Sequence, residues 1–192
     1  LKILKKQKID FVFIPKTREI YKKKTNKNLK IHIKKKILCG KFRKGHFEGV
    51  IDVIDRFLKL INPNYMFLGE KDFQQIFLIK KYVKKKFKVK IITCKTIRDK
   101  NYVALSSRNS LLTKKNLNVA GKIAKKLKSI KKNNNLKKKL NDLKNNLIKS
   151  YKIKIEYLEL RDEKDLSFHK RNSKSRIFIS YYINKVRLID NF

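Results

Sequence analysis

Acidic residues are scarce in this chain of 192 amino acids, which has 15 Asp and Glu against 54 Lys and Arg. The resulting formal charge of +39 first suggests nucleic-acid binding, because clustered basic side chains neutralise phosphates. The lysines, however, occur on every expected helix and loop, with runs at 34–36, 84–86, 125–126 and 137–139. Dispersed charge favours a solvated basic surface, so we expect no specific nucleic-acid partner. A basic nucleic-acid-binding protein remains an alternative.

Cysteines, histidines and long apolar runs are also scarce. Cys39 and Cys94 lack a C-x-x-C spacing and accompany only three histidines, which indicates neither a zinc site nor a disulfide framework. No apolar run approaches the roughly 18 residues that a membrane-spanning helix needs. The short run at 9–14 ends at Pro15 and Lys16, unlike a signal peptide. We therefore expect a soluble, cytoplasmic protein with no membrane partner and no metal-ligating residues.

Apolar strands alternate with amphipathic helices in the first half of the chain. We expect strands at 10–14, 65–68 and 89–94, of which the first is buried on both faces and the second is also buried. Helices are expected at 47–61 and 72–86, where apolar residues recur at steps of three and four. This alternation predicts a parallel α/β sheet, in which ligands bind beyond the carboxyl ends of the strands. The loops after the second and third strands are therefore the expected site.

The pattern changes near Ser110. Two helices are expected at 115–130 and 136–151, separated by an Asn-rich break at 133–135. Three strands follow, at 153–160, 176–182 and 186–189, and the short turn between the last two is consistent with antiparallel pairing. We therefore expect a smaller α+β domain in the second half of the chain.

Two short segments at the predicted sheet edge carry phosphate-binding side chains. Lys71 and Asp72 fall at a helix N-terminus, where backbone N–H groups favour an anion, although Asp72 could equally be a plain N-cap. Ser106, Ser107 and Arg108 follow the third strand and offer donors for phosphate oxygens, although such a segment is as often a cap or a surface loop.

A third segment precedes the first amphipathic helix. Arg43 is one of only nine arginines, and its planar guanidinium suits phosphate or carboxylate. His46 lies three residues further on, where a histidine is more often a cap or a packing residue than a catalyst.

Four segments together resemble the signature segments of a known family, in order, spacing and predicted context. They are GKFRKGHFEGV at 40–50, GEKDFQQ at 69–75, ALSSRN at 104–109 and RLIDN at 187–191. This chain resembles the pantothenate synthetases, or pantoate–β-alanine ligases, over essentially its whole length.

The resemblance implies a fold and an activity. The fold would be a Rossmann-like nucleotidyltransferase (adenylate-forming) α/β parallel-sheet domain, partial, at 1–109, and a small C-terminal α+β lid domain at 110–192. The enzyme would condense (R)-pantoate with β-alanine through pantoyl adenylate, using ATP and Mg²⁺ and releasing AMP and pyrophosphate. When full length it would be a homodimer.

The resemblance also implies roles for individual residues. Lys71, Ser106 and Arg108 would be catalytic, because they stabilise the phosphate in the transition state. Gln75 would bind pantoate, and Arg43 and His46 would flank the pocket without a defined role. The ATP site would comprise Gly69, Glu70, Lys71, Asp72, Ile97, Leu105, Ser106, Ser107 and Arg108.

The sequence departs from the family pattern in three respects. Lys44 stands where the family has proline, and Asn101-Tyr102 stands where it has Asp-Gly. The family's upstream PTMG-x-LH-x-GH and Asn-Pro-x-Gln motifs do not occur in this sequence. We therefore expect an N-terminally truncated chain that lacks the first βα unit and the catalytic histidines, and that is inactive by itself. An inactive remnant is the corresponding alternative.

Overall fold

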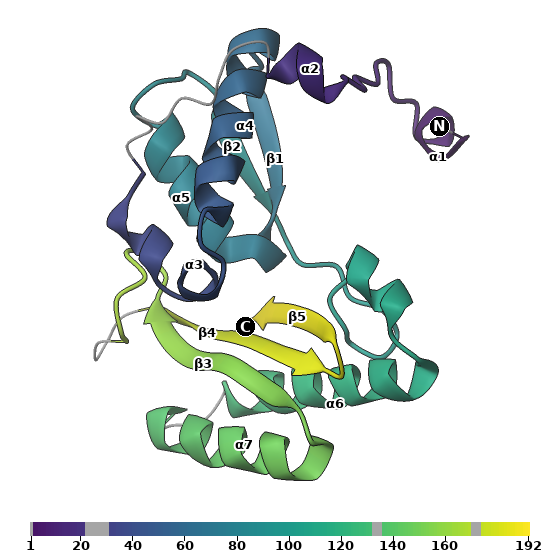
Figure 1. Ribbon diagram of the computed structural model, residues 1–192, viewed down its shortest axis with the longest axis vertical. Coiled ribbons are helices and arrows are strands. Elements are labelled where there is room, and N and C mark those ends of the chain that lie inside the picture. Colours follow the sequence, from purple (N-terminus) through teal and green to yellow (C-terminus); the bar gives the residue numbers. More distant parts are fainter. Residues whose placement is uncertain (1, 22–30, 132–135, 170–173) are drawn as a thin grey trace.

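The computed structural model describes residues 2–21, 31–131, 136–169 and 174–192. Part of the lysine-rich stretch after residue 14 and the break at 133–135 lie outside these residues. Figure 1 shows a parallel strand pair with its helices in the upper half and an antiparallel sheet with two further helices in the lower half. The elements before the parallel pair are α1 (Lys2–Lys6), α2 (Thr17–Ile20), η1 (Ile33–Lys36) and α3 (Cys39–Phe42).

The upper half confirms the predicted alternation from residue 46 onward. Strand β1 (Tyr65–Gly69) pairs in parallel with β2 (Lys90–Cys94), and helices α4 (His46–Ile61) and α5 (Phe73–Val83) contribute to one core with them. Helix α4 ends at Ile61, and Asn62, which follows it with a left-handed backbone (φ 46°), precedes Pro63. The short helix η2 (Glu70–Asp72) connects β1 to α5.

The expected strand at 10–14 is wrong. These residues form no strand, and Phe11 exposes 92% of its surface. An apolar run becomes a strand only where a neighbouring strand pairs with its backbone, and within the described residues β1 pairs only with β2.

The prediction that the strand at 65–68 is buried is wrong, because one face of the strand is only partly buried and the other is exposed. Met66 and Leu68 pack on the core formed by α4 and α5, whereas Tyr65 and Phe67 are 57% and 66% exposed. Side chains alternate along a strand, and the helices here cover a single face of the described sheet.

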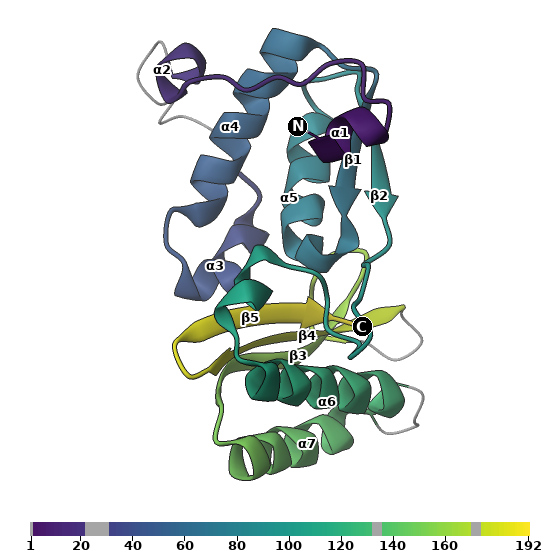
Figure 2. The same ribbon diagram turned by 90° about the vertical axis from the view of Figure 1, so that its right-hand side faces the viewer.

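The lower half confirms the predicted α+β arrangement. Strands β3 (Lys154–Asp162), β4 (Ser175–Ile183) and β5 (Val186–Asn191) form an antiparallel sheet in that order. Figure 2 shows α6 (Lys114–Ile130) and α7 (Leu136–Tyr151) along one face of this sheet. Their apolar sides meet the strands in a core that includes Ile123, Leu127, Leu147, Ile177 and Ile179, all buried.

The two halves share a core, which fixes their relative position at the site. Phe47 and Leu78 from the upper helices pack with Tyr157 and Phe178 from the lower sheet. The predicted boundary between residues 109 and 110 stays a prediction, and the short helix η3 (Ser107–Leu111) crosses it. Within the described residues, no helix is both long and apolar enough to cross a membrane.

Candidate active site

The predicted site lies at the carboxyl ends of the two parallel strands. Gly69 and Cys94 end β1 and β2 as register partners, so the segments that follow both strands begin at the same edge. The first segment turns through η2 into α5, and the second leads to η3. Strand β5 of the lower sheet faces this edge, because Asn191 hydrogen-bonds to the backbone of η2.

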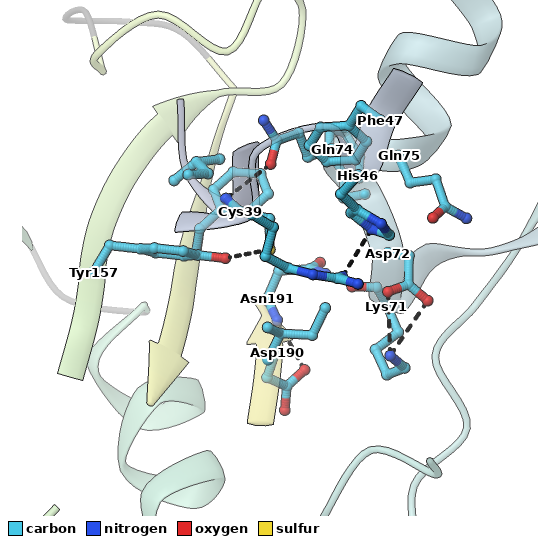
Figure 3. Close-up of a pocket in the computed structure, with 15 residues that line it drawn as sticks. Cys39, His46, Phe47, Lys71, Asp72, Gln74, Gln75, Tyr157, Asp190 and Asn191 are labelled. Carbon is cyan, nitrogen blue, oxygen red and sulfur yellow. Dashed lines mark hydrogen bonds and ion pairs between the residues drawn. The ribbon is translucent and has the colours of Figure 1, made fainter. Parts of the chain in front are cut away.

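Two adjoining pockets occupy this edge, and both are lined by Lys71, Ile189 and Asp190. The first pocket, drawn in Figure 3, lies between η2, α5, the start of α4 and the antiparallel sheet. Its polar lining includes Cys39, Arg43, His46, Lys71, Asp72, Gln74, Gln75, Tyr157, Asp190 and Asn191. The second pocket lies between the η3 segment, α6 and β5, and its polar lining includes Lys71, Ser106, Arg108, Asn109, Tyr181, Arg187 and Asp190.

The structure brings together the three residues expected to stabilise phosphate. Lys71, Ser106 and Arg108 line the second pocket from two segments more than 30 residues apart. Ser106 begins η3, and its Oγ accepts a hydrogen bond from Arg108 N at 3.2 Å, which leaves the hydroxyl hydrogen free to donate. Ser107 does not line either pocket, and its carbonyl accepts from Ser110 Oγ.

Lys71 and Asp72 occupy the expected helix N-terminus. Asp72 precedes α5 but its side chain makes no capping hydrogen bond, so the plain N-cap interpretation is not supported. Its carboxylate lies 3.3 Å from Lys71 Nζ and is 40% exposed. The Lys71 side chain is only 18% exposed, but water at Asp72 weakens the ion pair, so Lys71 can exchange Asp72 for a phosphate.

Glu70 binds the lower sheet and does not line either pocket. Its Oε1 accepts from Arg176 Nη2 at 2.7 Å, and Asn191 Nδ2 donates to the carbonyls of Glu70 (3.0 Å) and Lys71 (2.8 Å). Asn191 Oδ1 in turn accepts from Arg176 Nη1. Sequence reasoning missed Arg176 and Asn191 as site residues, although Asn191 ends the RLIDN segment.

Ile97 and Leu105, the expected adenine contacts, lie apart from the pocket linings. Their side chains are 71% and 52% exposed, and Leu105 N donates to Ile97 O at 2.9 Å. Their role with adenine stays a prediction. Gly69 likewise lines neither pocket and ends β1.

Arg43 and His46 form a hydrogen-bonded pair on the first pocket. Gly45 supplies the left-handed N-cap (φ 76°) from which α4 starts, and Arg43 Nη1 lies 2.8 Å from His46 Nε2. Burial, followed by the positive charges of Arg43 and Arg187, lowers the pKa of His46 below its ordinary value of 6.5. A neutral imidazole therefore accepts the hydrogen bond that Arg43 donates.

Gln74 and Gln75 are neighbours on α5 with different surroundings. Gln74 is buried, and its amide donates to the carbonyls of Lys34 and Ile37 and accepts from Cys39 N. These three bonds hold the chain that leads into α3. Gln75 lines the first pocket beside Asp72 and has no such partners within the described chain, as expected of a ligand-binding amide.

The segment between β2 and η3 contains interactions that the sequence did not predict. Arg98 binds the Asp190 carboxylate through two nitrogens, at 2.7 and 2.9 Å, and its guanidinium lies over the rings of Tyr102 and Phe192. Burial raises the pKa of Asp190 against the opposing effect of Arg98. Tyr102 adopts φ 73°, a left-handed conformation that costs a non-glycine residue roughly 1–2 kcal/mol. This explains why glycine suits the position in the family pattern that the sequence resembles.

A parallel α/β strand pair with a cationic double pocket at its carboxyl edge, covered by a small antiparallel unit, is the arrangement of an α/β enzyme that binds its ligand at that edge. Comparisons with known proteins identify the family. The family model described as Pantoate-beta-alanine ligase matches residues 1–192. The chain therefore belongs to the pantoate-beta-alanine ligase family.

Individual relatives agree with this assignment. A pantothenate synthetase from Clostridium botulinum (strain ATCC 19397 / Type A) is 38% identical over 191 residues, which cover 96% of this chain and 68% of the relative. One from Buchnera aphidicola subsp. Schizaphis graminum is 38% identical over 199 residues, covering 98% and 70%.

Two solved structures are similar as well. A pantoate-beta-alanine ligase from Francisella tularensis, complexed with beta-gamma ATP and beta-alanine, is 36% identical with a TM-score of 0.77, and the match covers 100% of this chain and 67% of that one. A pantothenate synthetase from Thermus thermophilus has a TM-score of 0.91 at 24% identity, covering 100% and 72%, and supports the fold alone.

Proposed function

We propose that the protein is an ATP-dependent ligase that joins (R)-pantoate to β-alanine through a pantoyl-adenylate intermediate. The observation that carries the proposal is the position of Lys71, which lines both the pocket of Ser106 and Arg108 and the pocket of Gln75. A lysine shared in this way can contact a phosphate in one pocket while a carboxylic acid approaches from the other. The family match across residues 1–192 disfavours the nucleic-acid-binding alternative.

The first step is adenylation. A carboxylate oxygen of pantoate attacks the α-phosphorus of ATP, and the bond from that phosphorus to the oxygen of the β-phosphate breaks, releasing pyrophosphate. Negative charge builds on the phosphoryl oxygens, and Lys71, Arg108 and the Ser106 hydroxyl are the donors that oppose it. Gln75 would orient pantoate from the first pocket.

The second step is aminolysis of the adenylate. The neutral amine of β-alanine attacks the acyl carbon, the bond from that carbon to the AMP oxygen breaks, and the nitrogen loses a proton to solvent. Adenylation has already made the carbon electrophilic, so this step requires mainly that the amine be positioned.

Mg²⁺ would accompany the nucleotide. Within the described residues, no group of three or more His, Cys, Asp or Glu side chains could hold a metal ion. Mg²⁺ usually keeps several water ligands and binds to ATP phosphates, so it needs no cluster of protein ligands. Asp72 is the partly exposed carboxylate of the first pocket that could add one ligand. When bound, Mg²⁺ would neutralise part of the phosphate charge.

Assembly and location belong to the proposal too. We expect a homodimer, which sedimentation of the purified protein would test. A cytoplasmic location also stays a prediction.

The proposal is tested on the complete protein by pantoate-dependent exchange of labelled pyrophosphate into ATP. Lys71→Ala and Arg108→Ala should each lower the exchange rate on the order of a hundredfold, because each removes a charged donor from the developing phosphoryl charge. Arg18→Ala is the control, since Arg18 is an exposed arginine that lines neither pocket. Unchanged exchange in both pocket variants would contradict the proposal.

A further inference from the structure

The arginines of the described chain divide into two groups by their partners. Arg18, Arg43 and Arg108 have no carboxylate partner among the described residues, and of these only Arg43 and Arg108 are half-buried. The paired arginines are Arg56 with Asp52, Arg98 with Asp190, Arg161 with Glu159, Arg176 with Glu70 and Glu163, and Arg187 with Glu156.

A half-buried guanidinium without a counter-ion is unfavourable, because desolvation of its charge is not offset by a partner. Arg43 and Arg108 each line one of the two adjoining pockets, so an anionic ligand in each pocket would supply the missing partner. The other half-buried arginines that the structure describes each pair with a carboxylate of the chain itself. Arg43 and Arg108 are therefore the two positions at which a ligand would supply the negative charge.

His46 fixes Arg43 without neutralising it. One N–H of Arg43 is directed to His46 Nε2 at 2.8 Å, and the neutral imidazole accepts it. The remaining N–H groups of the guanidinium fork have no partner in the part of the chain that the structure describes, and such a fork matches the two oxygens of a carboxylate. Leu38, Phe178 and Ile189 line the same pocket and can contact the methylene groups of a short chain.

The identity of the anion follows from what each substrate carboxylate must do. The phosphates belong with Arg108, which shares the second pocket with Ser106 and Lys71. The carboxylate of pantoate is the reacting group and must reach the α-phosphorus, so a permanent ion pair with Arg43, outside that pocket, would hold it away. The carboxylate of β-alanine stays charged and unreacted throughout.

We propose that Arg43, held by His46, binds the carboxylate of β-alanine and thereby selects an ω-amino acid over amines that lack this group. The inference rests on the proposed function and adds a substrate role that the resemblance left undefined. Arg43 binds the carboxylate end of β-alanine, while the amine of β-alanine reaches toward Lys71, where the two pockets meet.

The experiment measures both half-reactions in the wild type, Arg43→Ala, Arg43→Lys and the control Arg18→Ala. Adenylation is followed by pantoate-dependent pyrophosphate exchange, which needs no β-alanine. Amide formation is followed by AMP release with β-alanine, and then with propylamine, which keeps the amine and the chain but lacks the carboxylate.

Arg43→Ala should raise the KM for β-alanine on the order of a hundredfold, the effect expected when one partner of a shielded ion pair is removed. The preference for β-alanine over propylamine should fall by a similar factor, a change that a merely structural role would not produce. Arg43→Lys should recover part of that preference, because it restores the charge without the fork. Arg18→Ala should match the wild type.

The results distinguish a failure of the proposed function from a failure of the role of Arg43. Absence of exchange in the complete wild-type protein would contradict the proposed function itself. Exchange in the wild type together with an unchanged preference for β-alanine in Arg43→Ala would overturn the inference alone. A rise in the KM for pantoate without a rise for β-alanine would overturn it as well, because it would assign Arg43 to the other acid.

Discussion

Asn191 connects the lower sheet to the turn that carries Lys71, and its removal should be costly. Its side chain is buried, with 4% exposure, and makes three hydrogen bonds: two to the carbonyls of Glu70 and Lys71 and one from Arg176. A neutral hydrogen bond contributes about 1 kcal/mol net, and one to a charged group about 1.5–3 kcal/mol. Asn191→Ala should therefore lower the free energy of unfolding by roughly 3–5 kcal/mol.

This loss is measured by urea unfolding of the variant beside the wild type. Asn191→Asp retains the acceptor for Arg176 but loses both donor bonds to η2, so it isolates the contribution of the amide nitrogen. Asn118→Ala is the control, because Asn118 is exposed on α6 and should change stability by no more than about 0.5 kcal/mol. A loss below about 1 kcal/mol in Asn191→Ala would show that the hydrogen bonds to η2 do not hold the turn.

Four further predictions concern single positions. Gln75→Ala should raise the KM for pantoate far more than that for ATP, and an equal effect on both would remove the pantoate role. Gly121→Ala should destabilise the fold by about 1–3 kcal/mol in thermal or urea unfolding, because a Cβ there would lie 2.3 Å from the Asn101 carbonyl oxygen. Gly49→Ala, which meets no atom within 4 Å in α4, should instead stabilise it by up to about 1 kcal/mol. His46 has a folded-state pKa below 6.5, so its contribution to stability is present above that pH and is lost as pH falls through the folded pKa. An NMR titration that finds the pKa at or above 6.5 would refute this.

The position of the residues proposed to bind phosphate was predictable from sequence because topology determines it. Lys71 and Arg108 follow two strands that pair in parallel, and parallel strands deliver the segments after them to one edge. The partners of those segments were not predictable in the same way. Glu70 pairs with Arg176 across 106 residues, and Arg98 pairs with Asp190 across 92. No local spacing reports such contacts.

The same distinction applies to the fold. The helix at 46–61 was predictable because its period of apolar residues is a local property, and Asn62-Pro63 marks its end. The run at 10–14 has an equally apolar composition but forms no strand, since a strand depends on a backbone partner that the run itself does not encode. The exposed faces of Tyr65 and Phe67 also depend on what covers the sheet.

The hydrogen bonds from Asn191 to η2 have a consequence for biosynthesis. They join residues 120 and 121 positions apart, so the turn that bears Lys71 leaves the ribosome long before its anchor exists. At elongation rates of about 5–20 residues per second, the delay is roughly 6–24 s. During that interval the parallel strand pair can form, but η2 lacks the bonds that hold Lys71 between the two pockets. The nascent enzyme is therefore expected to complete its proposed phosphate site only when β5 joins the antiparallel sheet.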